Sequence, residues 1–322
     1  MSGDRGATAI LARCPPHSQV KTDCPHSYGG LRRVLQSACM FRSFVCALAL
    51  ALVTLSGGAC SPAAPAPAPT ASAELAVHFV DVGQGDAILV RTPEGKVMVI
   101  DGGPRQSGLV AYMRKVGVQQ VDVMVGTNAD ADHFGGLVDV LNALPVKEVW
   151  VSGQPNTTVT FERFVDAVAK SGAKGVTARR GDVIRLGGME ARVLHPVDPL
   201  FTDRNNNSVV VRLEFGKVSF LFTGDAERKA EESMLSAGVP LRSTVLKVGH
   251  HGSRTSSSPP FIVAIRPEVV VYQAGSGNSY GHPHKETLRT LAAAGVRVYG
   301  TDTRGTIVVR TDGQTYQVTT ER

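Results

Sequence analysis

From residue 75 onward the amino-acid sequence predicts an α/β fold arranged as a four-layer αββα sandwich. Short apolar runs of strand length alternate with amphipathic runs of helix length, and brief turns join them. The strands gather into two blocks, and each block also supplies helices. Two sheets that each carry helices on one face stack into four layers. Periodicity alone would equally allow one doubly wound sheet.

The first block begins with three short apolar runs that are close enough together to form a meander. Three helices and two further strands follow. The elements expected here are strands at 77–81, 87–91, 97–100, 121–126 and 148–152, and helices at 109–116, from residue 133, and at 161–171.

The second block is richer in strands and contains a hairpin whose turn is Gly216-Lys217. Its last part alternates strands with two helices. The elements expected here are strands at 191–195, 208–215, 218–223, 244–248, 269–273, 296–299, 306–310 and 316–320, and helices at 226–236 and 285–294.

The net charge of +6 comes mostly from the start of the chain. Residues 1–60 hold six basic and two acidic side chains, which leaves 28 basic and 26 acidic residues beyond position 60. The remaining chain therefore has a net charge of only +2. A large excess of basic residues would favour a polyanionic partner. The chain beyond position 60 has no such excess, so its net charge does not indicate a polyanionic partner.

All five cysteines also lie within the first 60 residues, at Cys14, Cys24, Cys39, Cys46 and Cys60. The rest of the chain can form neither a disulfide framework nor a thiolate metal site. Any metal ion there must be held by His, Asp or Asn side chains. The absence of cysteine suits an exported protein, although cytosolic proteins can also lack it.

Residues 43–55 form an uncharged apolar run of the length of a signal-peptide core, too short to cross a membrane as a helix. Arg42 precedes the run, and translation that begins at Met40 would give a short, positively charged segment before it. We therefore expect residues 1–39 to result from a start codon assigned too early. The alternative keeps them and interprets Arg32-Arg33 as a twin-arginine export signal.

Small residues precede Cys60, as in the lipid-attachment site of bacterial lipoproteins, although Gly57 stands where Leu is usual. The alternative is an ordinary cleaved signal peptide. A Pro/Ala-rich stretch follows and suits an extended tether. The domain expectation is a leader with a signal or lipoprotein segment at 1–60, a tether at 61–74 and one folded domain at 75–322. We expect an exported protein that is anchored to a membrane by lipid, or otherwise secreted.

The first cluster of chemically active side chains follows the apolar strand at 121–126 and precedes a helix. Alternation puts Asn128, Asp130 and Asp132 on one side of an extended loop, and His133 lies at the helix start. Three short oxygen ligands and an imidazole can hold divalent metal ions. The alternative is structural, with Asp130 or Asp132 capping the helix.

Asp130, Asp132 and His133, followed by Gly135-Gly136, resemble the metallo-β-lactamase superfamily, whose signature is His-x-His-x-Asp-His before Gly-Gly. In the ComEC-related branch the second His is often Asp, as Asp130 is here. Asn128 departs from the signature at the first His. An amide oxygen is a poorer ligand than imidazole, so we expect one of two metal positions to be weakened. The resemblance implies a metallo-β-lactamase αββα sandwich.

Further motifs extend the resemblance over residues 77–312. The opening VHFVDVGQGDA, the LKVGHHGS segment and the later YGHPH segment are the most specific matches to the ComEC-related branch. The matching segments are 77–87, 99–103, 205–208, 222–225, 246–253 and 280–284.

The resemblance also implies roles for individual residues. Asp132 would orient a water molecule or accept its proton, and His251 or Ser253 would contact the leaving oxygen. One or two divalent ions are expected, and the oxygen-rich ligand set suits Mn²⁺ at least as well as Zn²⁺. The implied metal ligands are Asn128, Asp130, Asp132, His133, Asp225, His250 and His282.

Some of these residues could have a structural role instead of binding a metal ion. Asp225 can cap the helix expected at 226, His250 and His251 can stabilise a Gly-Ser turn, and His282 can begin the helix that Pro283 favours. Asp101 is a supporting residue in the superfamily, and Asp86 is expected to bond its own backbone in a Gly-Asp turn. Structural roles are expected for His78, His195 and His284.

The resulting expectation is an exported metal-dependent hydrolase of the phosphodiesterase or nuclease kind, with DNA or another phosphodiester as the partner. Two alternatives stay open. One is a metallohydrolase of esters, lactones or lactams, because the fold hosts many substrates. The other is a catalytically weakened binding protein, because Asn128 can empty a metal position. The sequence identifies no protein partner.

Overall fold

The computed structural model describes residues 74–322. The leader at 1–60 and nearly all of the tether at 61–74 lie outside the described residues, so those expectations stay predictions. Within 74–322 no helix is both long and apolar enough to span a bilayer.

The first sheet has eight strands, in the spatial order β15-β14-β1-β2-β3-β4-β5-β6. Its members are β1 (Leu75–Phe79), β2 (Ala87–Arg91), β3 (Val97–Gly102), β4 (Val121–Gly126), β5 (Val146–Val151), β6 (Lys174–Thr177), β14 (Ile307–Thr311) and β15 (Tyr316–Thr320). The strands from β3 to β6 run parallel to one another, and β1 closes the other half by antiparallel pairing with β2 and β14.

The second sheet has seven strands, in the order β13-β12-β11-β10-β9-β8-β7. Its members are β7 (Val183–Leu186), β8 (Met189–His195), β9 (Val210–Phe215), β10 (Val218–Phe222), β11 (Val245–Lys247), β12 (Val269–Tyr272) and β13 (Arg297–Gly300). The hairpin predicted at Gly216-Lys217 is confirmed by the antiparallel register of β9 and β10. The strands from β10 to β13 are parallel.

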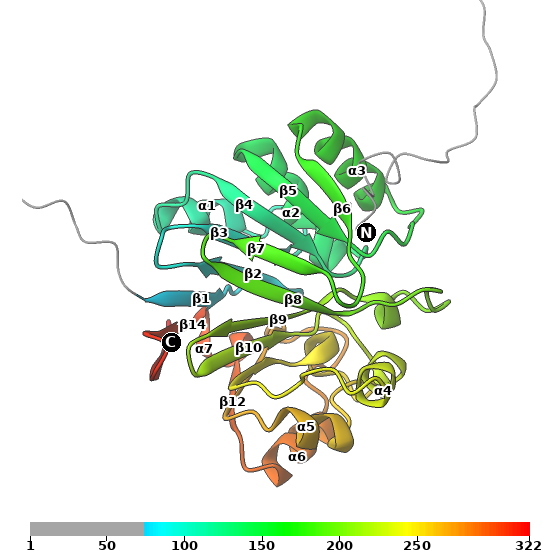
Figure 1. The fold of residues 1–322 in the computed structure, drawn as a ribbon, viewed down its shortest axis with the longest axis vertical. Coiled ribbons are helices and arrows are strands. Elements are labelled where there is room, and N and C mark those ends of the chain that lie inside the picture. The colour runs from blue at the N-terminus through cyan, green and yellow to red at the C-terminus, as the bar shows by residue number, and fades with distance from the viewer. Residues whose placement is uncertain (1–73) are drawn as a thin grey trace, which may run out of the picture. The chain divides into compact units, whose positions relative to one another are not determined.

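Helices cover the outer face of each sheet (Figure 1). The first sheet carries α1 (Leu109–Lys115), α2 (Ala131–Ala143) and α3 (Val159–Ser171), and the second carries α4 (Arg228–Ser236), α5 (Pro259–Ile265) and α6 (Lys285–Ala293). A single short helix, α7 (Thr301–Arg304), follows β13.

Three apolar cores separate these four layers. Phe79 and Phe222, from different sheets, pack in the core between the sheets. Phe134 and Phe164 belong to the core under α2 and α3, and a third core lies under α4, α5 and α6. Burial of apolar surface on both faces of each sheet confirms the four-layer αββα sandwich. The single doubly wound sheet that periodicity also allowed is wrong.

The sequence did not predict four of the described strands and α-helices, and there is a physical reason why each was missed. The run of β6 contains Gly175 and only four residues, β7 is an equally short edge strand, and α7 is a single turn. The helix α5 begins with Pro259-Pro260, which is typical of a turn although proline is tolerated in the first helical turn. Short elements give too few periods for the apolar pattern to be recognised.

The helix expected from residue 226 begins instead at Arg228, and its N-cap residue is Glu227. Asp225 is therefore not the residue that caps it. Asp130 does occupy the N-cap position of α2, but its side chain makes no capping hydrogen bond. Both carboxylates are thus available for contacts other than helix capping.

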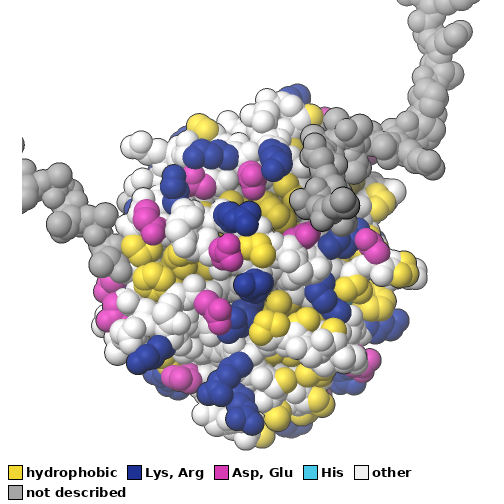
Figure 2. Space-filling model, in the orientation of Figure 1, with side chains coloured by type: hydrophobic (Ala, Val, Ile, Leu, Met, Phe, Trp, Pro, Cys, Tyr) yellow, Lys and Arg dark blue, Asp and Glu magenta, His cyan; other side chains and the backbone are white. Residues whose placement is uncertain are grey.

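Charge is distributed evenly over the surface that can be seen. Figure 2 shows Lys and Arg side chains interspersed with Asp and Glu across one face, with no large area of a single sign. This agrees with the near balance of charge beyond position 60. Recognition of a charged ligand must therefore come from a local arrangement of residues.

Candidate metal centre

The candidate site lies where strands of both sheets end. The loop after β4 leads into α2, and the loops after β10 and β11 belong to the second sheet. Gly135 and Gly136 let the start of α2 rest directly on the loop after β3, because a Cβ on Gly136 would collide with the carbonyl oxygen of Gly102. This close contact places His133 beside the end of β3.

Asp101, near the end of β3, holds His133 in place. Its carboxylate oxygen Oδ2 lies 2.9 Å from Nδ1 of His133, and both side chains are fully buried. The backbone N–H and the hydroxyl of Thr127 donate to the same carboxylate, over 2.8 and 2.5 Å. A carboxylate on one imidazole nitrogen fixes the tautomer and directs the other nitrogen, which is the usual support of a metal-ligating histidine.

The opposite nitrogen of His133 points at Asp225, which follows β10. The distance from His133 Nε2 to Asp225 Oδ2 is 3.0 Å. Gly224 precedes Asp225 with a φ of 51°, and a side chain there would collide with Thr127. The turn therefore requires glycine to bring the second sheet this close to the first.

His251, after β11, completes the cluster. Its Nε2 lies 3.2 Å from Asp132 Oδ2 and 3.5 Å from Asp225 Oδ1. His250 and His251 both have positive φ, 45° and 54°, which non-glycine residues rarely adopt. Strained backbone of this kind is retained where the surrounding structure determines it, often at functional sites.

The other nitrogen of His251 is held from behind by Asp86. Nδ1 lies 3.0 Å from Asp86 Oδ1 and 3.0 Å from the carbonyl oxygen of Gln273. Lys247, which is completely buried, pairs with Asp86 over 2.5 Å. The expectation that Asp86 bonds its own backbone in a turn is wrong, because its carboxylate is directed at His251 and Lys247. His133 and His251 thus share one arrangement, with a carboxylate behind each imidazole.

Electrostatics tie these groups together. Burial alone would lower the pKa of His251, but Asp225 and Asp86 raise it to about 10. Burial would likewise lower the pKa of His133, but Asp225 and Asp101 raise it well above its ordinary value. Burial would raise the pKa of Asp225, whereas His133 and His251 hold it well below its usual range. The buried carboxylates need positive partners, and protons on imidazoles and a divalent cation are interchangeable in that role.

The residues fit a divalent metal ion. His133 Nε2, His251 Nε2 and Asp225 Oδ1 are buried and make no hydrogen bond of good geometry, although each lies within 3.5 Å of another atom of the cluster. The ligand atoms of Asp132, His133 and His251 lie within 4.8 Å of one another. Imidazole nitrogens and carboxylate oxygens that converge in this way are ligands for Zn²⁺ and for similar ions.

The remaining predicted ligands do not belong to the groups of converging ligand atoms among the described residues. The amide nitrogen of Asn128 donates to Asp130 and to Asn205, over 3.3 and 2.8 Å, while its amide oxygen is buried and has no hydrogen-bond partner. Asp130 also accepts from Asn156 and Arg204. The half of the motif that contains Asn128 and Asp130 is therefore bound into its own hydrogen-bond network.

His250 and His282 lie beside His251, with ring centroids 5.9 and 6.0 Å from its own. Nδ1 of His250 lies 2.8 Å from Glu227 Oε1, and its ring centroid is 5.4 Å from that of His282. His282 has a buried Nδ1 with no hydrogen-bond partner. Ser253, predicted to contact the leaving oxygen, bonds Thr255 through its hydroxyl over 2.9 Å.

The structure therefore brings together Asp132, His133, Asp225 and His251. Sequence reasoning gave His251 a catalytic role, but its Nε2 sits among the candidate ligand atoms. It assigned no role to Lys247 and Glu227, although Lys247 belongs to the LKVGHHGS segment that was singled out. His78, His195 and His284 bond Tyr112, the carbonyl oxygen of Asn206 and the backbone of Arg254 respectively.

Comparison with known proteins agrees with this fold and site. Residues 80–275 match the metallo-β-lactamase superfamily, and the chain belongs to it. ComE operon protein 3 of Bacillus subtilis is 32% identical over 261 residues, which cover 75% of this chain and 34% of that protein. Competence protein ComA of Neisseria gonorrhoeae is 33% identical over 237 residues, covering 73% of this chain and 32% of that protein. These relatives place the chain in the ComEC-related branch, and it spans about a third of their length.

A solved structure shows the same fold. The diiron β-hydroxylase CmlA of Streptomyces venezuelae superposes with a TM-score of 0.51 and 15% sequence identity, covering 74% of this chain and 54% of that one. At this identity the likeness concerns the fold alone. The ligand set of this chain is therefore argued from its own residues.

We expect Asp86→Asn to weaken metal binding on the order of 10–100-fold, the usual cost of removing the partner behind a ligating histidine. The amide keeps the shape of the side chain but loses the charge that holds His251. Titration of chelator-treated protein with Zn²⁺ measures the effect. Asp81→Asn is the matched control, because Asp81 belongs to the same motif but pairs with Arg322 at the surface.

Loss of the Asp86 charge also leaves Lys247 buried without an anionic partner, which is destabilising. The double variant Asp86→Asn, Lys247→Met removes both charges and separates folding from metal affinity. Wild-type affinity in a folded Asp86→Asn protein would mean that Asp86 serves only to neutralise Lys247.

Proposed function

We propose that this protein is a metal-dependent phosphodiester hydrolase of the phosphodiesterase or nuclease kind. The observation that carries the proposal is the convergence of the buried His133, His251 and Asp225, whose facing atoms lie 3.0 and 3.5 Å apart without a hydrogen bond of good geometry. The names of the relatives add support, because they refer to competence and, for a protein of Haemophilus influenzae, to recombination. Both are processes that involve DNA.

Bound at this cluster, divalent ions supply Lewis acidity toward water and toward phosphoryl oxygens. Asp225 lies between His133 and His251 and would hold an ion against both imidazoles. Asp132, whose side chain is 33% exposed, is the carboxylate of the cluster that water reaches, and it would orient that water or accept its proton. His250, fixed by Glu227 at the solvent side, is placed to meet a leaving oxygen.

One tightly held ion and a weaker second one fit the arrangement best. Asp132, His133, Asp225 and His251 offer the first position, whereas Asn128 and Asp130 are occupied by hydrogen bonds to neighbouring side chains. With carboxylate and amide oxygens beside imidazole, Mn²⁺ and Zn²⁺ are both suitable. Of Asn128 and Asp130, only Asn128 keeps a buried unpartnered atom, its amide oxygen, which is a weak ligand for the second position.

A substrate panel tests the proposal. We expect hydrolysis of bis-p-nitrophenyl phosphate and of single-stranded DNA with Mn²⁺ or Zn²⁺, and little with a lactone or a cephalosporin. Asp225→Ala should lower kcat/KM by more than about 100-fold, since loss of a ligand exceeds loss of its supporting partner. Asp139→Ala, which removes a surface carboxylate paired with Arg105, serves as the control.

Turnover of the lactone or the cephalosporin without phosphodiester hydrolysis would instead identify another metallohydrolase of this fold. Tight metal binding without turnover of any substrate would identify a catalytically weakened binding protein. An Asp225→Ala variant with wild-type metal content and rate would remove Asp225 from the metal centre.

We expect Asn128→His to raise metal affinity at the second position by about 10–100-fold and to shift preference toward Zn²⁺, because imidazole donates more strongly than an amide oxygen. Titration of chelator-treated wild-type and variant protein with Zn²⁺ and Mn²⁺ measures both effects. Unchanged affinities in a folded variant would show that residue 128 does not face the metal position.

We also propose that the protein is exported and anchored by lipid, on the strength of the apolar run at 43–55, the small residues before Cys60 and the tether that follows. Mass spectrometry of the mature amino terminus is expected to find a lipid-modified Cys60. An unmodified terminus at or beyond Ser61 would leave a secreted protein without the anchor.

A further inference from the structure

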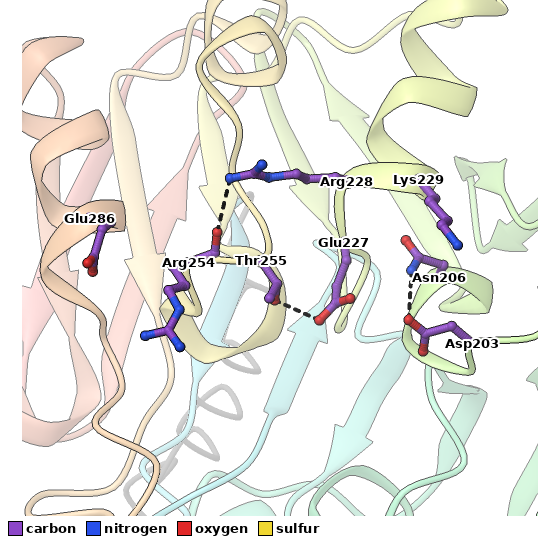
Figure 3. A pocket seen from close by; sticks show the side chains of 8 residues that line it. All are labelled: Asp203, Asn206, Glu227, Arg228, Lys229, Arg254, Thr255 and Glu286. Carbon is purple, nitrogen blue, oxygen red and sulfur yellow. Dashed lines mark hydrogen bonds between the residues drawn. The ribbon is translucent and has the colours of Figure 1, made fainter.

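A pocket of about 500 Å³ opens beside the candidate metal centre (Figure 3). Three cationic residues line it, Arg228 and Lys229 at the start of α4 and Arg254 after the LKVGHHGS segment. Thr255 and Glu227 lie between them in Figure 3. The pocket borders the metal centre directly, because Glu227 lines it and also holds His250 over 2.8 Å.

The acidic and basic groups of this pocket differ in their partners. Glu227 accepts hydrogen bonds from Thr255 and His250, and Asp203 accepts from Asn206 and from the backbone of Asn205. These carboxylates are therefore largely satisfied within the protein.

The cations are not satisfied in this way. Within residues 74–322, Arg228, Lys229 and Arg254 form no ion pair with a carboxylate. Arg228 makes one long hydrogen bond, 3.5 Å, to the carbonyl oxygen of Arg254. Glu286 lies on the pocket wall beyond Arg254 and is attracted to it, although the two side chains form no ion pair. Most of the guanidinium and ammonium donors are thus free for an anion.

The free donors belong to side chains and not to the helix end. In the first turn of α4, the N–H of Arg228 donates to the carbonyl oxygen of Thr255, and the N–H of Ala230 donates to Asn206. The helix dipole adds to the positive potential there, but binding of an anion would depend on the arginine and lysine heads. Guanidinium groups bind phosphate with two parallel hydrogen bonds.

We propose that this pocket is a phosphate subsite, which binds the phosphate next to the scissile one in a nucleic-acid strand. The inference rests on the proposed function and extends it, because it identifies the substrate as a polymer of phosphodiesters and not a small diester. A strand whose scissile phosphate lies at the metal centre would pass Glu227 and place a neighbouring phosphate against Arg228 and Arg254. Phosphate contacts of this kind position a strand without reading its sequence.

Binding of a fluorescent single-stranded oligothymidylate to chelator-treated protein tests the subsite without any turnover. We expect the double variant Arg228→Gln, Arg254→Gln to bind roughly tenfold or more weakly, the scale of losing charge-assisted hydrogen bonds. The slope of log affinity against log salt should fall by about 0.7 for each phosphate that the variant no longer neutralises. Lysine at both positions should restore much of the affinity, because it keeps the charge.

Arg192→Gln is the matched control. Arg192 is exposed and lines a different pocket together with Arg212, and it forms no ion pair among the described residues. Its loss should leave oligothymidylate binding and the salt slope unchanged. An equal loss of affinity in this variant would show non-specific attraction and would overturn the subsite.

Activity gives a second, separable readout. In the double variant, KM for the oligonucleotide should rise while kcat/KM for bis-p-nitrophenyl phosphate stays at the wild-type value, since that substrate has one phosphate. Wild-type KM and affinity for the oligonucleotide in the variant would overturn the subsite and leave the proposed function intact. Absence of all hydrolysis would reject the proposed function. Weakened oligothymidylate binding in the variant would then show a phosphate-binding pocket for a nucleic-acid strand, and would overturn its assignment as a neighbour of a scissile phosphate.

Discussion

Two buried carboxylates that stand behind two imidazoles determine how this protein is put together. Asp101 holds His133 and Asp86 holds His251, and between the imidazoles lies Asp225. Buried ionised groups are costly unless each has a partner of opposite charge. The loops from both sheets must therefore meet in one arrangement, and the positive φ of His250 and His251 and the glycines at 135 and 136 follow from that demand.

The fold could be predicted from the sequence to a large extent, and the reasons are specific. Long apolar runs such as that of β4 and the amphipathic pattern of α3 give several periods each, so their type is clear. The short β6 and β7 and the proline-led α5 lack that signal. The confirmed family resemblance fixed the sandwich, because periodicity alone left a doubly wound sheet open.

The site could be predicted less completely, because long-range partners leave no local pattern. His133 and Asp132 stand together within one recognisable motif. The role of Asp86 depends on Lys247 and His251, which lie more than 150 positions away in the sequence. Sequence reasoning assigned Asp86 to its own turn, since a Gly-Asp pair has a ready local explanation. Arg204 likewise carries no local signal, because only the docking of the second sheet places it beside Asp130. The partners of Glu227, His250 and Thr255, are also more than 20 positions away in the sequence.

The position of the cluster between the two sheets has a consequence for folding. Asp132 and His133 come from the first sheet and its helix, whereas Asp225 and His251 come from the second. An ion held by all four would act as a cross-link between two halves of the chain that are made at different times during synthesis. Because the complete set of ligands exists only once both halves have docked, uptake of the ion would report that assembly is finished and would stabilise only the assembled state.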